Sequence, residues 1–125
     1  MEKEMEKNNY YGKLIFEGEY IKGERNGKGK EFYNNHNLRY KGEYLNGKKW
    51  NGEGYNIKGN MEYKIKDGKG NIKEFNYNGK LEFEGEYLKG ERNGKGKEYN
   101  KGGKIIFEGE YKNGKQWHIN GYNIW

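Results

Sequence analysis

The chain contains no cysteine and no proline, and it also lacks serine, threonine, alanine and valine. Without cysteine, no disulfide framework can form. The absence of serine, threonine and cysteine excludes hydroxyl and thiol nucleophiles, N-x-[ST] glycosylation sites and Ser/Thr phosphorylation sites. Asp67 is the only aspartate. We therefore expect a chain that is not an enzyme and that uses no cofactor, no metal and no small-molecule substrate.

Long hydrophobic runs are also missing. No apolar run approaches the length of a membrane span, and the opening residues MEKEMEKNNYYG lack the hydrophobic segment of a secretory signal. These absences predict an intracellular, cytoplasmic location, with peripheral membrane association as the alternative.

The composition is polar but carries enough aromatic rings for a core. Only 30% of the 125 residues are hydrophobic and 35% are charged, and the mean hydropathy of −1.50 is typical of disordered chains. However, 17% of the residues are aromatic, and each ring buries on the order of 150–250 Å². The net charge is +6, but lysine and glutamate alternate at short range, as in KGKGKE. This pattern predicts a surface of both signs and not the basic stripe of a nucleic-acid groove.

Internal repeats organise the whole sequence. Residues 16–31 (FEGEYIKGERNGKGKE) return at 83–98 with one difference, Ile21 against Leu88, so the long repeat has an offset of 67 residues (83 − 16). A shorter unit of 20 to 24 residues lies within it, as judged from the aromatic positions 16, 40, 63, 83 and 107. We expect a polar N-terminal tail or cap at residues 1–9, either helical or disordered. A single array is expected over 10–125, with units near 13–37, 38–60, 61–79, 80–104 and 105–125.

Each unit has the pattern of a β-hairpin. In LIFEGEY, alternate residues fall on opposite faces of an extended strand, and GKGKEFY supplies the return strand. Glycines beside aromatic residues let a ring lie across the neighbouring backbone, so they serve as seats for the rings. The expected register places four pairs opposite one another: Glu17–Lys30, Glu19–Lys28, Gly18–Gly29 and Tyr20–Gly27.

The repeated positions are expected to form the stacked aromatic core and its glycine seats. They are Phe16, Gly18, Tyr20, Gly27, Gly29, Tyr40, Gly42, Tyr44, Phe83, Gly85, Tyr87, Gly94, Gly96, Phe107, Gly109 and Tyr111.

The third unit differs from the others because it lacks the GEY segment. Its Asp67-Gly68 pair predicts a tight type I′ hairpin, which places Tyr63 opposite Ile72 and Ile65 opposite Gly70. The other hairpins are expected to have longer loops. The loops of the second and fifth units are expected to be the largest and to carry Trp50 and Trp117.

The segment from Phe16 to Tyr20, followed by Gly23 and Gly27-Lys28-Gly29, is similar to the MORN motif (membrane occupation and recognition nexus). That motif has an aromatic residue, a glycine and a second aromatic in alternation, then a spaced glycine and Gly-x-Gly. Residues 40–54, 83–96 and 107–121 resemble it more loosely, and the fifth unit has Ile119 where the motif has glycine. A bacterial, antitoxin-associated MORN variant is also similar, through turns like 77–80 (YNGK), and both subfamilies stay open.

The resemblance implies an all-β fold, an elongated array of stacked antiparallel hairpins with about ten short strands, and non-catalytic roles in scaffolding, dimerisation and attachment near membranes. The hairpin pattern of the residues leads to the same architecture independently. Terminal units of such arrays need capping, and we expect Trp125 to cover the C-terminal end.

Candidate contact residues come from the tryptophans and lysines. Trp50 and Trp117 are either packed over a loop or exposed as partner anchors, and Lys48 and Lys49 beside Trp50 are candidate partner contacts. The candidate lipid contacts are Lys28, Lys30, Lys95 and Lys97. His36 and His118 are expected to be solvated loop residues, and the paired glutamates of the GEY segments are expected to lie on a solvated face.

The leading functional hypothesis is a scaffold that binds a protein partner or self-associates through a sheet edge or array end. The alternatives are tethering to anionic, phosphoinositide-containing membranes, which predicts salt-dependent binding, and antitoxin-like partner binding. Nucleic-acid binding ranks below these: aromatics interleaved with lysine can stack bases, but the interspersed glutamates oppose it. An enzyme ranks last.

Overall fold

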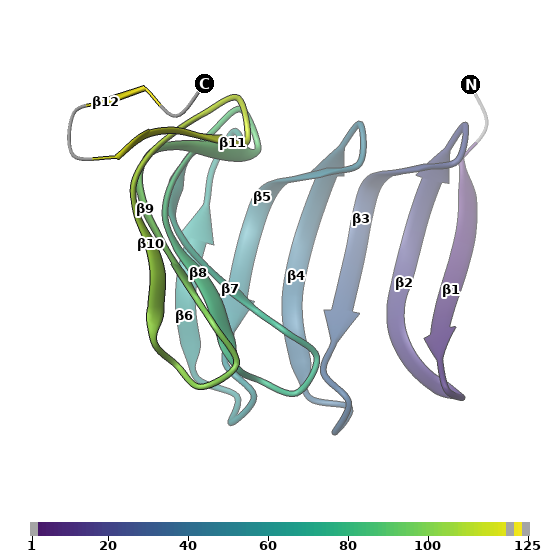
Figure 1. Ribbon diagram of the computed structural model, residues 1–125. Helices are drawn as coiled ribbons and strands as arrows, with labels where there is room; N and C mark the ends of the chain where they lie inside the picture. The colour runs from purple at the N-terminus through teal and green to yellow at the C-terminus, as the bar shows by residue number, and fades with distance from the viewer. Residues whose placement is uncertain (1–2, 120–121, 124–125) are drawn as a thin grey trace.

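A computed structural model describes residues 3–119, 122 and 123 of the chain, and they form β-strands joined by turns (Figure 1). The all-β fold of stacked antiparallel hairpins is confirmed. The strands are β1 (Glu4–Tyr10), β2 (Lys13–Ile21), β3 (Glu24–Phe32), β4 (Leu38–Leu45), β5 (Lys48–Tyr55), β6 (Met61–Ile65), β7 (Gly70–Phe75), β8 (Leu81–Leu88), β9 (Glu91–Tyr99), β10 (Ile105–Lys112), β11 (Lys115–Ile119) and β12 (Tyr122–Asn123).

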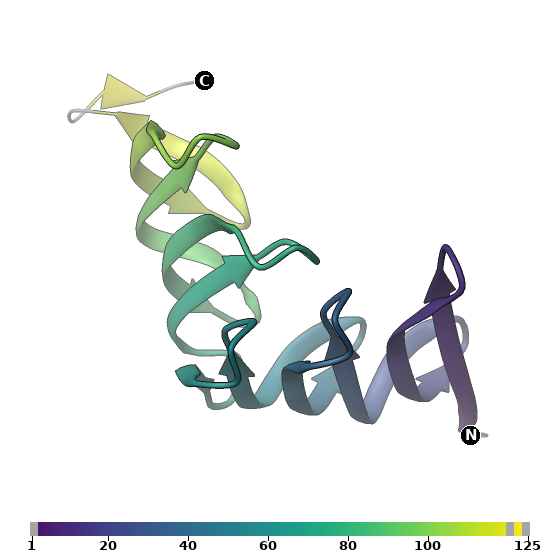
Figure 2. The same cartoon turned by 90° about the horizontal axis from the view of Figure 1, so that it is seen from below.

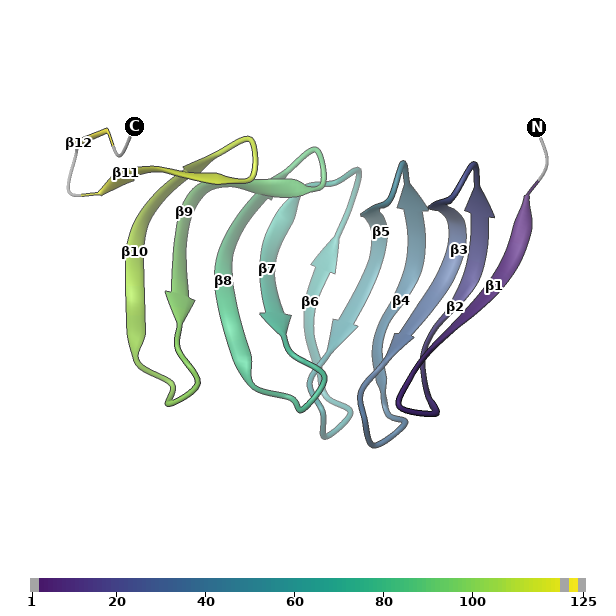
Figure 3. The same ribbon diagram turned by 45° about the vertical axis from the view of Figure 1, so that its right-hand side comes forward.

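The strands form two open sheets in which each strand pairs with its neighbour in sequence. The first sheet has the order β1 to β6 and the second runs from β7 to β12, and Figure 3 shows the strands of both sheets side by side. The first four predicted units each contain one pair of consecutive strands, from β2–β3 to β8–β9, and the fifth contains β10, β11 and β12. Trp125, the expected C-terminal cover, lies outside the described residues.

The N-terminal segment is part of the array. The sequence analysis expected a helical or disordered tail or cap at residues 1–9, whereas Glu4–Tyr10 form β1 and pair along β2. Asn8 lies opposite Phe16 in this pair, as Glu74 of β7 lies opposite Phe83. β1 therefore takes the place before β2 that β7 takes before β8.

The turns at one end of the strands all have two central residues with positive φ. They are Lys22-Gly23, Asn46-Gly47, Asp67-Gly68, Lys89-Gly90 and Asn113-Gly114, with φ near +50° at the first residue and +76° to +85° at the glycine. Such values define type I′ turns, whose twist matches that of the flanking strands. The type I′ turn at Asp67-Gly68 is thus confirmed. The longer loops expected for the other hairpins are wrong, because the additional residues form bulges within the strands.

Most turns at the other end use asparagine side chains, whereas Tyr11-Gly12 between β1 and β2 has positive φ values of 50° and 74°. Asn56 Oδ1 accepts hydrogen bonds of 3.0 Å from the backbone N–H of Lys58 and Asn60. Asn76 and Asn100 do the same two and four residues on, at 2.9 to 3.0 Å. These Asx turns satisfy backbone donors that leave the ladder, which explains the abundance of asparagine between the units.

The predicted register of the hairpin β2–β3 holds up to Gly18 and shifts between Gly18 and the turn at Lys22-Gly23. Glu17 lies opposite Lys30 and Gly18 opposite Gly29. Beyond Gly18 the register shifts, so that Tyr20 faces Arg25 and the predicted pairing of Tyr20 with Gly27 is wrong. The predicted pair Glu19–Lys28 is also absent from the ladder, and the carboxylate of Glu19 instead accepts the backbone N–H of Lys28 at 2.7 Å.

The core follows the aromatic positions of the repeat. Phe16, Tyr40, Tyr44, Phe83, Phe107 and Tyr111 are buried, and Tyr20 and Tyr87 pack against them. A Cβ atom on Gly29 would lie 2.8 Å from Tyr44 Cε1 and 2.9 Å from Phe16 Cε1, which is too close for real atoms. Gly18, Gly29, Gly85, Gly96 and Gly109 seat rings as expected, whereas the expectation is wrong for Gly27 and Gly94, where a Cβ would meet the carboxylates of Glu19 and Glu86. Four further buried residues were not predicted as part of the core from the sequence: Tyr33, Tyr63, Ile65 and Ile72.

The array bends between β6 and β7, as the end-on view in Figure 2 shows. The predicted pairs Tyr63–Ile72 and Ile65–Gly70 are wrong, because the pairing of these strands is limited to the bridge between Lys66 and Lys69. The strands separate beyond this bridge, and Ile65 and Ile72 enter the same buried cluster. Contacts such as Asn34 N–H to Tyr77 C=O at 2.9 Å tie the two sheets together.

Candidate interaction surface

The second sheet carries a groove of about 760 Å³ on the face opposite its aromatic core. Its floor includes the backbone of Gly85, Gly96 and Gly109, and charged side chains line both sides. The charges change sign from strand to strand: Glu84 and Glu86 on β8, Lys95 and Lys97 on β9, Glu108 and Glu110 on β10. We call these three pairs the charge bands.

The first sheet has an equivalent but smaller groove of about 420 Å³. Glu17 of β2 and the lysine pair of β3, Lys28 and Lys30, line it as their counterparts do in the second sheet. On β4 the pattern breaks, because Lys41 and Glu43 have opposite charges. Lys41 occupies the repeat position of Glu108 (108 − 41 = 67), so one substitution interrupts the third band.

The four candidate lipid contacts all lie in these grooves. Lys28, Lys30 and Lys95 are exposed and Lys97 is half-buried. Glutamates lie beside them in the sheets, since Lys97 lies between Glu84 and Glu108 and Lys30 pairs with Glu17 on one side and with Lys41 on the other. The lysines thus form no single-sign patch of the kind that anionic membranes attract.

Trp50 is packed against the bend. It lies in β5 at a bulge between β4 and β5, and not in an enlarged loop as expected. Its carbonyl accepts the Gly68 N–H at 2.9 Å, and a Cβ on Gly68 would lie 2.6 Å from Trp50 Cζ3. Of the two alternatives raised by the sequence, the structure therefore shows packing for Trp50.

Trp117 occupies the equivalent bulge in the second sheet. It lies in β11, half-buried, with Lys112 Nζ 4.6 Å from the centre of its ring and the His118 ring at 4.7 Å. His118 is therefore a strand residue, contrary to the expectation of a loop, whereas His36 is exposed in a turn. Of the two tryptophans, Trp117 therefore remains the candidate contact for a partner protein.

The candidate partner contact Lys49 is not available at the surface. Its side chain is 20% exposed and its Nζ lies 3.6 Å from Glu31 Oε1 and 3.2 Å from the Tyr63 hydroxyl. This placement contradicts the expected partner role of Lys49. Lys48 is partly exposed and pairs with Glu91 across the bend.

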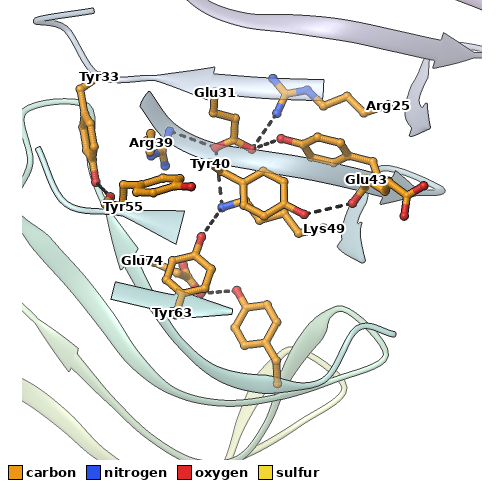
Figure 4. A network of polar contacts seen from close by, with 12 residues as sticks. Arg25, Glu31, Tyr33, Arg39, Tyr40, Glu43, Lys49, Tyr55, Tyr63 and Glu74 are labelled. Atoms are coloured by element: carbon orange, nitrogen blue, oxygen red, sulfur yellow. Dashed lines mark hydrogen bonds and ion pairs between the residues drawn. The ribbon is translucent and has the colours of Figure 1, made fainter. Parts of the chain in front are cut away.

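Glu31 is the centre of a buried ion cluster (Figure 4). Its side chain is 6% exposed and accepts a hydrogen bond from the Tyr44 hydroxyl. Arg25 and Arg39 approach it at 3.4 and 3.5 Å, so that with Lys49 three cations surround one carboxylate. Arg39 also lies over the Tyr77 ring at 4.3 Å, which joins the cluster to the second sheet.

Electrostatics within the cluster favour the charged forms. Burial acts to raise the pKa of Glu31, but Lys49, Arg39, the Tyr44 hydroxyl and Arg25 together hold it below the ordinary value. Burial acts to lower the pKa of Lys49, and the negative charge of Glu31 raises it overall. Burial and the Glu31 charge both raise the pKa of Tyr44, which keeps its hydroxyl a donor.

The second sheet repeats this arrangement with fewer cations. Glu98 accepts hydrogen bonds from Tyr111 at 2.5 Å and from Gln116 at 2.6 Å, and Arg92 lies at 3.7 Å. Arg92 is shared with Glu74, to which it donates two hydrogen bonds of 2.8 and 2.9 Å. Glu74 thus supplies Arg92 with the bidentate partner that Arg25 lacks.

Sequence reasoning did not identify the Glu31 cluster, although a signal for it exists. Gly29 and Glu31 alternate on one strand, so Glu31 had to share the aromatic face that the glycine seats define. A charged residue on that face requires buried partners. Their identity depends on Arg39 and Lys49 of other strands, which a single hairpin does not reveal.

Within residues 3–119, 122 and 123, no group of three or more histidine, cysteine, aspartate or glutamate residues is placed to hold a metal ion. The same residues include no helix that is long and apolar enough to cross a membrane. Comparison of the chain with protein-family models, with curated proteins and with solved structures finds no match.

Proposed function

We propose that this chain is a MORN-like, non-catalytic scaffold that binds a polypeptide partner along its grooved face. The observation that carries the proposal is the continuous groove of the second sheet, which is lined by residues of the five neighbouring strands β7 to β11 and by charges of both signs. The opposite face is occupied by the aromatic core, so the grooved face is the broad surface that a partner can reach. Polypeptides carry charges of both signs, which suits such a lining.

Membrane tethering fits this surface less well. A vesicle of anionic lipid would meet Glu84, Glu86, Glu108 and Glu110 beside every lysine of the second groove, and like charges at close range oppose binding. The same argument applies to nucleic acid, whose phosphates need a groove of positive charge.

A selection from a library of displayed random peptides tests the proposal. The full-length chain is the bait, and a Lys95→Glu/Lys97→Glu variant is used for counter-selection, because both lysines lie in the groove. We expect sequences of mixed charge that bind the native chain and not the variant. In parallel, flotation is measured with neutral and phosphoinositide-containing vesicles at physiological salt. Retention on the anionic vesicles, together with a peptide selection that yields nothing specific, would overturn the proposal in favour of lipid binding.

A further inference from the structure

The charge bands of the second sheet are more regular than structural stability requires. Glu86, Lys95, Glu108 and Glu110 are exposed, and the ion pair between Lys97 and Glu108 is long, at 3.8 Å. Exposed pairs of this kind contribute little to folding. Some of the carboxylates have partners within the sheet, since Glu86 accepts the backbone N–H of Lys95 at 3.1 Å and Glu84 accepts the Tyr99 hydroxyl. The bands still present charge, negative on β8, positive on β9 and negative on β10, to whatever lies in the groove.

The spacing of the bands favours one kind of polypeptide structure. Neighbouring strands are about 4.8 Å apart, so the two intervals between the three bands cover about 10 Å. On an α-helix, the positions i, i+3 and i+7 lie on one stripe, and two intervals cover about 10 Å at a rise of about 1.5 Å per residue. Same-face residues of an extended strand are about 6.8 Å apart, and two of those intervals cover about 14 Å. A helix that lies along the groove stays in register with the bands, and an extended chain does not.

We propose that the groove of the second sheet binds an α-helix of a partner protein that carries alternating lysine and glutamate residues at spacings of three and four. This inference rests on the proposed scaffold function and specifies its partner. The helix lies across β8, β9 and β10 and places basic, acidic and basic side chains over the three bands in turn. Glycine backbone forms the floor between the two charged rows.

The first sheet provides a natural negative control. Its β2 and β3 bands match those of β8 and β9, but Lys41 replaces the glutamate that Glu108 supplies on β10. The basic residue of a helix that fits the second groove would meet Lys41 in the first. The native chain is therefore expected to bind one helix and not two.

Synthetic peptides of about 18 residues on an alanine background test the proposal, since this length forms a helix in isolation. One peptide carries the alternating stripe. A second has the same composition with lysines in one half and glutamates in the other, and a third has the stripe but includes central prolines that prevent helix formation. Binding to the full-length chain is measured by fluorescence anisotropy at low and physiological salt. We expect the striped helix to bind at least about tenfold more tightly than either control.

Two variants test whether the helix binds over the charge bands. Glu108→Lys introduces the residue found at the equivalent position of the first sheet, and we expect it to weaken binding of the striped helix roughly tenfold. Lys41→Glu completes the third band in the first sheet, and we expect it to raise the stoichiometry from one peptide to two. Glu4→Lys and Lys101→Glu make the same charge changes at exposed positions outside both grooves and are expected to change neither value.

Equal binding of all three peptides, or unchanged affinity and stoichiometry in both groove variants, would overturn the helix proposal. The outcome of the library selection is separate. Selected peptides that bind the groove in extended form would support the scaffold function and would still overturn the helical partner.

Discussion

The two long repeats begin with almost the same sixteen residues but bury them differently. In both, the phenylalanine is fully buried and an arginine lies over its ring, Arg25 at 3.8 Å from the centre of Phe16 and Arg92 at 4.1 Å from Phe83. The glutamate that ends the segment differs, since the side chain of Glu31 is 6% exposed and that of Glu98 25%.

Two substitutions outside the shared segment account for the difference. Arg39 and Lys49, which contact Glu31, are replaced at the equivalent positions by Ile106 and Gln116. Of these two replacements, Gln116 contacts Glu98, to which it donates a hydrogen bond as a neutral side chain. The repeated segment therefore fixes the ring seat and the first arginine, whereas residues of the following strands decide how much charge is buried.

Neutralising the two glutamates should show the largest contrast. Glu31→Gln leaves Arg25, Arg39 and Lys49 without their counter-charge, and breaking a buried ion pair in this way costs about 3–5 kcal/mol. Glu98→Gln keeps an amide acceptor beside a single cation that Glu74 also binds, so we expect a cost of about 1 kcal/mol. Urea unfolding of both variants measures the difference. Equal costs would show that the extra cations do not require the charge of Glu31.

Alanine in the ring seats should affect both sheets alike. A Cβ on Gly29 or Gly96 would lie 2.7 to 2.9 Å from the nearest rings, so we expect Gly29→Ala and Gly96→Ala each to destabilise the fold by about 1–3 kcal/mol through overpacking. Gly59→Ala, where a Cβ meets no atom within 4 Å, is a control for crowding, although its φ of +93° adds backbone strain. If Gly29→Ala were neutral and Gly96→Ala severe, the two seats would not be equivalent.

The sequence predicted the features that depend on local pattern. Alternation placed Phe16, Gly18 and Gly29 correctly, and the Asp67-Gly68 dipeptide predicted its turn because asparagine, aspartate and glycine tolerate positive φ. The other four type I′ turns were not predicted: lysine at positions 22 and 89 carries no such preference, and the Asn-Gly pairs at 46–47 and 113–114 were assigned to enlarged loops in spite of their signal. Their presence moves residues from the loops into bulges and displaces Tyr20 from Gly27.

Features that depend on distant strands were missed or misplaced. Lys49 looked like a surface residue beside a tryptophan, but Glu31 of another hairpin holds it in the interior. The opening between β6 and β7 follows from the burial of Ile65 and Ile72 in one cluster, which a ladder drawn for an isolated hairpin cannot anticipate. The segment before Tyr10 has no glycine or phenylalanine and was therefore not recognised as a strand.

Acid should weaken the first repeat through Glu31. Because the pKa of Glu31 is held below its ordinary value of 4.5 in the folded state, its charge stabilises the fold above about pH 4.5, and this contribution is lost as the pH falls through the lowered pKa. The protonated carboxyl resembles the amide of Glu31→Gln. The difference in unfolding free energy between wild type and this variant should therefore shrink as the pH falls below about 4.5. A difference that stays constant below this pH would rule out titration of Glu31 as its source.

Exchanging the residues at positions 49 and 116 should have the smallest effect and tests the comparison most directly. Lys49→Gln gives Glu31 the neutral donor that Glu98 has, while Arg25 and Arg39 still balance the charge, so we expect a loss of about 1 kcal/mol. Gln116→Lys gives Glu98 a second cation at a site that solvent reaches, where an ion pair contributes about 0.5 kcal/mol at most. The double variant should equal the sum of the two changes, since the positions share no partner. A larger gain from Gln116→Lys than loss from Lys49→Gln would mean that the second repeat lacks only this cation. We expect the loss from Lys49→Gln to exceed the gain from Gln116→Lys. That result would mean that a lysine at this repeat position stabilises the fold only where Arg39 and the bend bury it.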